Sequence, residues 1–113
     1  MPSFRASLGI VDARPGVPPE AVLDTARAAL AAVRQVEDAF VDVEPLLRGD
    51  GIPRVVVRFL EPTGNDAEED ARAWQAAMVM AAGVEAVAET VGLRVYRRAG
   101  GRWLPLTDPG LGR

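Results

Sequence analysis

The amino-acid sequence predicts an α+β fold, with an antiparallel sheet of four strands and two helices on one of its faces. Four segments alternate between apolar and polar residues, which is the pattern of a strand with one buried side. Two longer segments repeat apolar residues every three or four positions, as an amphipathic helix does. Along the 113 residues the order is strand, helix, strand, strand, helix, strand. A chain of this length suffices for one globular domain.

The first strand is predicted over residues 4–12, where the even-numbered side chains are mostly apolar. A turn rich in proline and glycine follows, and Pro18 and Pro19 suit the start of a helix, where an N–H group is not needed. We expect this helix over residues 19–35. Its apolar stripe consists of Val22, Leu23, Ala26, Ala29, Leu30 and Val33. The stripe should lie against the sheet.

Two further strands are predicted in the middle of the chain. Residues 36–44 alternate between an apolar set and a second set that is acidic with one aromatic, Phe40. A glycine-containing connection over residues 48–53 lets the chain reverse. Residues 53–61 alternate again and are rich in β-branched valine, which favours a strand.

The second helix should begin at Asp66, because Asp66 followed three residues later by Glu69 forms a capping-box pattern. Its acidic first turn suits the positive end of the helix dipole. The apolar spacing extends this helix over residues 67–91, with an interruption near Gly83 and a stop at Gly92. Its predicted core stripe is Trp74, Ala77, Ala81, Val84, Ala88 and Val91.

The C-terminal part contains a fourth strand and the signal for a fifth. Residues 93–98 alternate, and Gly100 with Gly101 indicates a hairpin turn. A short fifth strand over residues 102–106 would be confined to a sheet edge by Pro105, which lacks an N–H group. We therefore expect one domain over residues 1–106 and a frayed tail over residues 107–113.

The composition excludes several kinds of catalytic and metal chemistry. All 13 basic residues are arginine, and the chain has no lysine, histidine or cysteine. It therefore has no disulfide, no thiolate or Schiff-base nucleophile, no imidazole acid or base, and no Cys or His ligand for a metal. We expect neither a cofactor nor a metal ion.

Nucleic acid and membranes are not the expected partners. Sixteen acidic residues against 13 arginines give a net charge of −3, which provides no general attraction to an anionic polymer or surface. The longest apolar run, residues 76–84, is far shorter than the roughly 20 residues of a membrane helix. With no signal-peptide pattern and no cysteine, a cytoplasmic location is expected. Abundant arginine and alanine without lysine is typical of a GC-rich bacterial sequence.

The order of elements is the split βαββαβ arrangement of ferredoxin-like folds. There the helices cover one sheet face and leave the other, which we call the open face, without a helix. The third strand lies between the first and the second, so that the arginines of the third strand stand beside the aspartates of the second. The residues predicted for the open face are Arg5, Ser7, Gly9, Asp38, Phe40, Asp42, Arg54, Val56, Arg58, Arg94, Tyr96 and Arg98.

The open face carries the candidate ligand-binding site. The pairs of opposite charges on neighbouring strands can be explained without a binding role, because each such pair stabilises the sheet by about 0.2–1 kcal/mol. The arginines of the first and fourth strands have no matching acids in this arrangement, and Tyr96 adds an aromatic ring. Arginine binds carboxylate and phosphate with two parallel hydrogen bonds and stacks on rings, so we expect an anionic or planar ligand. The candidate ligand-binding residues are Arg5, Arg54, Arg58, Arg94, Tyr96 and Arg98.

The second helix predicts a self-association surface. Its apolar run surrounds the helix axis, and a helix that is apolar all round is buried on more than one side. The candidate interface residues are Val79, Ala82, Gly83 and Ala86. Small side chains there would let a second copy approach, so we expect a twofold homodimer. The alanines have another explanation, since alanine is a good helix former even where it is exposed. The open face is the competing surface for self-association.

These observations favour a small oligomeric binding or accessory protein without enzymatic activity, which recognises an anionic or planar ligand or a protein partner. The alternative is a cofactor-free enzyme or ligand sensor, since the size and topology resemble those of the dimeric α+β barrel class. A pocket between sheet and helices, lined by Tyr96, Arg94 and a carboxylate, would favour that alternative. RNA-binding domains of this topology stack bases on aromatic residues of the central strands. This chain has Ser7 and Val56 at those positions, so the sequence does not favour an RNA-binding role.

Overall fold

The computed structural model describes residues 1–44 and 51–109 and confirms the α+β class. It contains two helices and a five-stranded antiparallel sheet. The elements are β1 (Ser3–Ala13), α1 (Pro19–Ala31), β2 (Val36–Glu44), β3 (Ile52–Leu60), α2 (Asp66–Glu85), β4 (Ala88–Ala99) and β5 (Arg102–Pro105). Residues 48–50 of the predicted connection and residues 110–113 of the predicted tail lie outside the described part.

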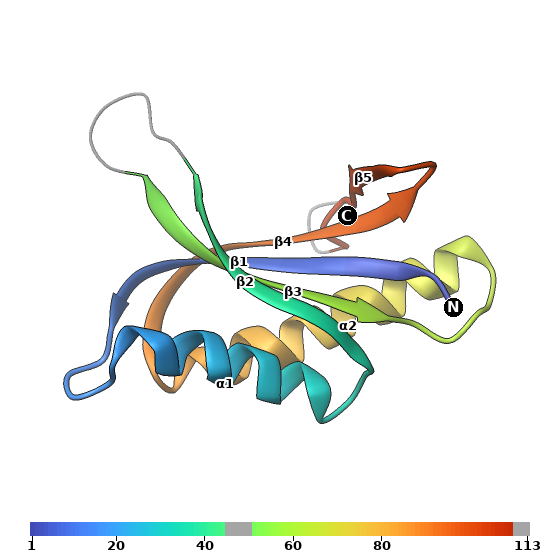
Figure 1. Ribbon diagram of the computed structural model, residues 1–113. Helices are drawn as coiled ribbons and strands as arrows, with labels where there is room; N and C mark the ends of the chain where they lie inside the picture. Colours follow the sequence, from blue (N-terminus) through green and yellow to red (C-terminus); the bar gives the residue numbers. More distant parts are fainter. Residues whose placement is uncertain (45–50, 110–113) are drawn as a thin grey trace.

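The strands are ordered β2-β3-β1-β4-β5, and all neighbours are antiparallel. β3 lies between β1 and β2, and β4 lies on the other side of β1, as predicted. β5 pairs with β4 and gives the sheet a fifth strand, so the layout differs from the four-stranded sheet of the prediction. Both helices lie on one side of the sheet, and the described residues place no helix on the opposite side, the open face (Figure 1).

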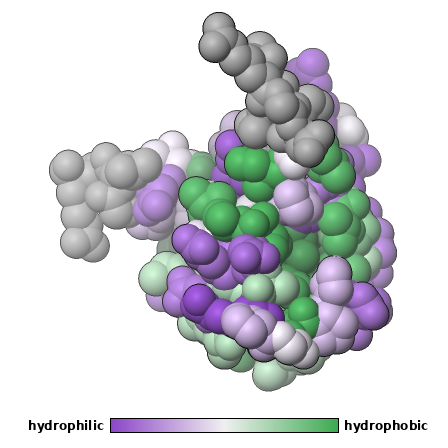
Figure 2. Space-filling model, turned by 90° about the vertical axis from the view of Figure 1, so that its left-hand side faces the viewer, coloured by the Kyte–Doolittle hydropathy of each residue, from purple (hydrophilic) through white to green (hydrophobic). Residues whose placement is uncertain are grey.

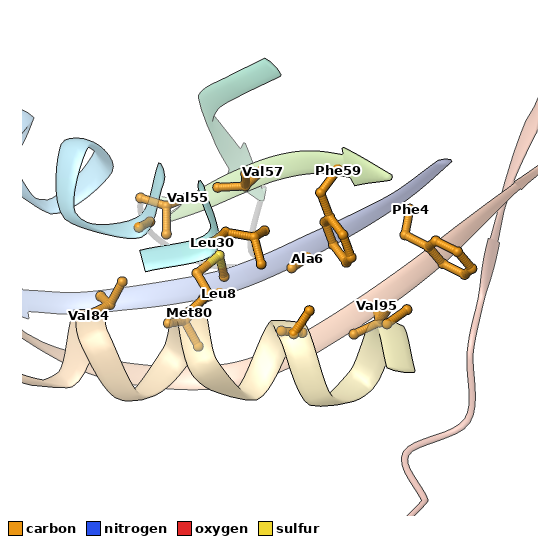
Figure 3. Packing of buried hydrophobic residues seen from close by; sticks show 14 of the residues in the cluster. Phe4, Ala6, Leu8, Leu30, Val55, Val57, Phe59, Met80, Val84 and Val95 are labelled. Atoms are coloured by element: carbon orange, nitrogen blue, oxygen red, sulfur yellow. The ribbon is translucent and has the colours of Figure 1, made fainter. Parts of the chain in front are cut away.

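The core lies between the sheet and the two helices. Phe4, Ala6 and Leu8 of β1 point to this side and are buried. Figure 3 shows them packed with side chains of β3, α1 and α2. The rings of Phe4 and Phe59 stack with their centroids 6.0 Å apart. Burial of each large apolar side chain stabilises the fold by about 1.5–3 kcal/mol, so this layer determines which residues face away from the helices.

α2 ends at Glu85, well before the predicted end at residue 91. Ala88 and Val91, which the apolar spacing assigned to this helix, lie on β4 instead. Ala88 is buried opposite Ala13 of β1, whereas Val91 is 46% exposed. Gly92 is not a helix stop but part of β4, with a φ of +64°. The prediction was wrong here because the helical spacing continues into β4, and only pairing with β1 marks the change.

The helix ends also differ from the prediction in detail. α1 ends at Ala31 rather than at residue 35. The cap of α2 is Asn65, not Asp66, because the Asn65 Oδ1 accepts a hydrogen bond of 2.9 Å from the Glu68 N–H. This bond satisfies one of the N–H groups that a helix start leaves without a partner. Within the described ranges, neither helix combines the length and the apolar character that crossing a membrane requires.

Candidate ligand-binding site on the open face

A pocket of about 460 Å³ lies on the open face, away from both helices. Its lining residues are Arg5, Ser7, Phe40, Asp42, Val43, Arg54, Val56, Arg94, Tyr96 and Trp103. All except Val43 and Trp103 belong to the set that the sequence predicts for the open face. The pocket thus contains Tyr96, Arg94 and a carboxylate, but on the opposite side of the sheet from the one that would favour an enzyme.

Trp103 of β5 brings three arginines of the open face together. Its ring centroid lies 4.2 Å from the Cζ atom of Arg5. The corresponding distances are 5.2 Å to Arg98 and 5.3 Å to Arg58. A guanidinium within about 6 Å of a ring centroid is attracted by the ring. The structure therefore gathers all six predicted ligand-binding residues, four lining the pocket and two beside the same indole ring.

Arg5 stands at the centre of this cluster. Its Cζ atom also lies 5.3 Å from the Phe40 ring centroid. Its Nε atom is buried and has no hydrogen-bond partner in the described part of the chain. Burial, and then repulsion from Arg58 and Arg98, lowers the pKa of Arg5 below the ordinary value for arginine. The side chain remains a cation at neutral pH, so the cluster holds a half-buried positive charge that an anion would stabilise.

Arg54 forms the floor of the pocket and is only 5% exposed. Its Nε donates a hydrogen bond of 2.8 Å to the Ser7 Oγ, and its Nη2 donates one of 3.1 Å to the Ser7 carbonyl oxygen. Nη2 also donates to the carbonyl oxygen of Gly92. These bonds connect β3 with β1 and β4. Arg54, predicted as a ligand-binding residue, thus supports the pocket from beneath.

Gly9 makes room for the Arg54 guanidinium, and Gly92 lies beside it. A Cβ atom at Gly9 would lie 3.1 Å from the Arg54 Nη1 and 2.7 Å from the carbonyl oxygen of Val91. Gly92 has a positive φ, which glycine adopts without steric cost. The pairing of β1 with β4 is irregular between Ser7 and Gly9, as at a β-bulge. This irregularity fixes which side chains of the following part of β4 face the pocket.

Asp38 and Asp42 lie opposite the arginines of β3 in the β2–β3 pairing, as predicted. Each carboxylate accepts a hydrogen bond of 2.9 Å from the backbone N–H of the next residue. Both act to raise the pKa of Arg5, against the larger effects of burial and of the neighbouring arginines. The site therefore contains negative charge of its own, which repels a ligand in proportion to the ligand's charge.

Arg58 has a partner that the alternation pattern does not predict. Its Nε donates to the Glu37 Oε1 at 3.1 Å, and the Ser3 Oγ donates to the same oxygen at 2.6 Å. The pairing of β2 with β3 is irregular between Val36 and Asp38, and this irregularity places Glu37 beside Arg58. Arg58 is thereby held in an ion pair at the edge of the Trp103 cluster.

The four candidate interface residues, three on α2 and Ala86 directly after its end, do not share one surface. The exposed ones are Val79, Ala82 and Ala86. Gly83 faces α1 instead, since a Cβ atom there would lie 2.9 Å from the Cβ of Ala29. Gly83 therefore permits close packing between the helices. The exposed apolar surface of α2 includes Met78, which is 60% exposed.

A second hollow of about 290 Å³ lies where β1 ends and α1 begins. Its lining residues are Ile10, Val11, Asp12, Ala13, Pro19, Val22, Val41, Pro53, Arg54 and Val55. Figure 2 shows this end of the molecule, where hydrophobic surface gathers. The lining of the hollow is mainly aliphatic and contains no aromatic ring, although Arg54 borders both the hollow and the open-face pocket.

Comparison of the chain with protein-family models, with curated proteins and with solved structures gives no match. In residues 1–44 and 51–109, no group of three or more metal-ligating side chains is placed to hold a metal ion. The open-face pocket combines aromatic rings with arginines.

Proposed function

We propose that the protein binds a small anionic ligand in the open-face pocket, and that binding rather than catalysis is its function. The observation that supports this proposal is the Arg5 guanidinium, which stacks on Trp103 and keeps a buried Nε without an acceptor. A buried donor left without a partner costs about 1–3 kcal/mol, and more when it is charged. A bound anion would accept hydrogen bonds from this guanidinium and balance its charge.

The charges around Arg5 support the same kind of ligand. Arg98 and Arg58 stand at the same indole ring, and the charge of Arg58 is shared with Glu37, so Arg98 adds positive charge where β5 borders the pocket. Arginine presents its N–H groups in a planar fork that fits carboxylate and phosphate oxygens. The acidic net charge of the whole chain therefore coexists with a local site for an anion.

Binding accounts for the pocket better than catalysis does. The enzyme alternative calls for a pocket between the sheet and the helices that is lined by Tyr96, Arg94 and a carboxylate. Tyr96 and Arg94 line the open-face pocket instead, and the hollow at the start of α1 contains neither of them, while packed side chains fill the core beside it (Figure 3). The open-face pocket has walls made of strands alone. The alternative of a ligand sensor is compatible with this position, because a sensor also works by binding.

Three further parts of the interpretation are proposals. The fold is a ferredoxin-like domain extended by β5, which the relative order of β1 to β4 supports. The chain forms a homodimer through α2, which the exposed Met78 and Val79 support. A bacterial, cytoplasmic origin is supported by the composition alone.

Anion binding is tested by isothermal titration calorimetry at low ionic strength with sodium phosphate, acetate and benzoate. The wild type is compared with Arg5→Gln and with Arg27→Gln, a matched control that removes the same charge from an exposed position on α1. At least one anion should bind the wild type and the control alike and bind Arg5→Gln about tenfold or more weakly. No binding by any of the three anions, or equal binding by both variants, would overturn the proposal.

A further inference from the structure

We infer that the ligand of the open-face pocket is an aromatic monocarboxylate, with a flat ring system and a single negative charge. This inference rests on the anion binding proposed above and adds the shape and the charge of the ligand. Two features carry it: the rings that line the pocket, and the acceptors that the arginines of the site already have.

The pocket presents aromatic rings from three strands. Phe40 of β2, Tyr96 of β4 and Trp103 of β5 line it, together with the aliphatic side chains of Val43 and Val56. Rings prefer stacked or edge-to-face neighbours, which add about 0.5–1.5 kcal/mol beyond the burial of area. A flat aromatic ligand can make these contacts, whereas a hydrated inorganic ion cannot. The volume of about 460 Å³ falls in the range of about 300–1,000 Å³ for small-molecule sites.

Among Arg5, Arg54 and Arg58, the hydrogen bonds favour Arg5 as the group that takes the charge, whereas Arg94 and Arg98 are exposed to solvent. Arg54 donates to Ser7 and Gly92, and Arg58 donates to Glu37. The Arg5 guanidinium has ring contacts and a buried Nε without an acceptor. A carboxylate fits the edge of one guanidinium with two parallel hydrogen bonds. One carboxylate therefore matches what Arg5 offers.

The acids of the site favour one negative charge over two. Asp42 lines the pocket, and both Asp42 and Asp38 interact with Arg5. Their repulsion of a ligand doubles when its charge goes from −1 to −2, because Coulomb energy is proportional to charge. Sites for phosphate groups commonly use the N–H groups of a helix N-terminus or of a backbone nest. Here all the lining residues belong to strands, so the pocket has no helix N-terminus of this kind.

The inference is tested by calorimetric titration with five probes. The aromatic acid is 2-naphthoate, and 2-naphthamide is its uncharged counterpart. Cyclohexanecarboxylate carries the same charge on a ring that is not flat, and inorganic phosphate and adenosine monophosphate carry more charge. 2-Naphthoate should bind wild type most tightly, and the amide and the cyclohexane acid should each bind about tenfold or more weakly.

Four variants connect the binding to the named residues. Arg5→Gln and Trp103→Leu should weaken 2-naphthoate about tenfold or more, whereas Trp103→Phe, which keeps a ring, and Arg27→Gln should stay within about threefold of wild type. Thermal unfolding followed by circular dichroism shows whether each variant is folded. If Trp103→Leu is unfolded, the comparison of 2-naphthoate with cyclohexanecarboxylate on the wild type still decides whether a flat ring is required.

The outcomes separate the two proposals. Tighter binding of phosphate or adenosine monophosphate than of 2-naphthoate, lost in Arg5→Gln, would overturn the aromatic monocarboxylate and leave anion binding in place. Equal binding of 2-naphthoate and 2-naphthamide would overturn both, because the charge would then play no part. Failure of all five probes to bind would also overturn both.

Discussion

The Arg5 guanidinium carbon lies 4.2 Å from the centroid of the Trp103 ring, although β4 separates their strands in the sheet. In the ladder, Arg5 is opposite Tyr96 and Trp103 is opposite Arg98. The two side chains therefore meet over the open face of β4 and connect the first strand of the sequence with the last. The same contact that builds the candidate site also holds the edge strand β5 against the sheet.

Replacing Trp103 by alanine should destabilise the protein as well as open the site. The ring contacts of Arg5, Arg58 and Arg98 are lost together, and we expect the free energy of unfolding to fall by about 1–2 kcal/mol. Urea unfolding followed by circular dichroism measures this. Leu104→Ala, a neighbouring exposed position on β5, is the control and should change the stability by less than about 0.5 kcal/mol. Equal losses in the two variants would show that the ring contacts contribute nothing.

The composition of the open face follows from the alternation of the strands. Arg5, Arg94 and Tyr96 can be placed there because the period of two allows each strand only two faces, and the apolar one must be buried. Trp103 was not assigned to the site, since a short edge strand shows too little alternation. The sequence feature that could have placed Trp103 is the hairpin turn at Gly100 and Gly101, because the register that this turn sets puts residue 103 opposite residue 98.

Other features depend on contacts between distant segments. The burial of Arg54 depends on Gly9 of β1 and on the carbonyl oxygen of Gly92 in β4, and alternation within β3 does not predict either contact. The end of α2 at Glu85 is set by the pairing of Ala88 with Ala13, against a helical spacing that continues beyond it. Local patterns are overridden at such points by tertiary pairing.

Arg54→Met should cost more than the loss of an exposed arginine. The variant keeps much of the aliphatic stem but leaves the Ser7 and Gly92 carbonyl oxygens without their donor. We expect the free energy of unfolding to fall by about 2–4 kcal/mol. Arg27→Met on exposed α1 serves as the matched control in the same urea titration. If both variants unfold at the same urea concentration, the buried hydrogen bonds do not hold the three strands together.

Gly9→Ala tests the close approach of β1, β4 and Arg54. The new Cβ atom would lie 2.7 Å from a backbone oxygen of Val91, so the strands must shift. We expect a loss of about 1–3 kcal/mol in the free energy of unfolding. Gly64→Ala is the control, because its Cβ atom would meet only the flexible ends of side chains, chiefly that of Arg72. A Gly9→Ala variant as stable as Gly64→Ala would contradict the predicted clash.

Glu69 makes the free energy of unfolding depend on pH. The hydrogen bond from the Gly64 N–H, and then the bond from Arg97, hold the pKa of Glu69 below its ordinary value of 4.5. A carboxyl whose pKa is lower in the folded chain stabilises the fold above the unfolded value, and this stabilisation is lost as the pH falls through the folded pKa. The difference in unfolding free energy between wild type and Glu69→Gln should therefore be constant from about pH 6 to 8 and shrink below about pH 4.5.

Urea titrations at a series of pH values measure this difference. Glu20→Gln, at an exposed position in the first turn of α1, is the control and should show a smaller dependence on pH. A wild-type advantage over Glu69→Gln that persists unchanged to about pH 3 would contradict the assignment, since below the ordinary pKa the unfolded chain binds a proton at Glu69 more readily than the folded chain does.

The exposed apolar side chains of α2 predict a homodimer that a single charge should break. Val79 is 43% exposed beside Met78, and Val79→Glu would bury a carboxylate without a partner in a helix-to-helix interface. Size-exclusion chromatography with light scattering should give a dimer for the wild type and for Gln35→Glu, which adds the same charge at an exposed position outside α2, and a monomer for Val79→Glu. A monomeric wild type would rule out self-association through this helix. A Val79→Glu variant that stays dimeric would move the interface elsewhere, and the open face is then the surface to test, because a second copy seated there would compete with the ligand for Arg5 and Trp103.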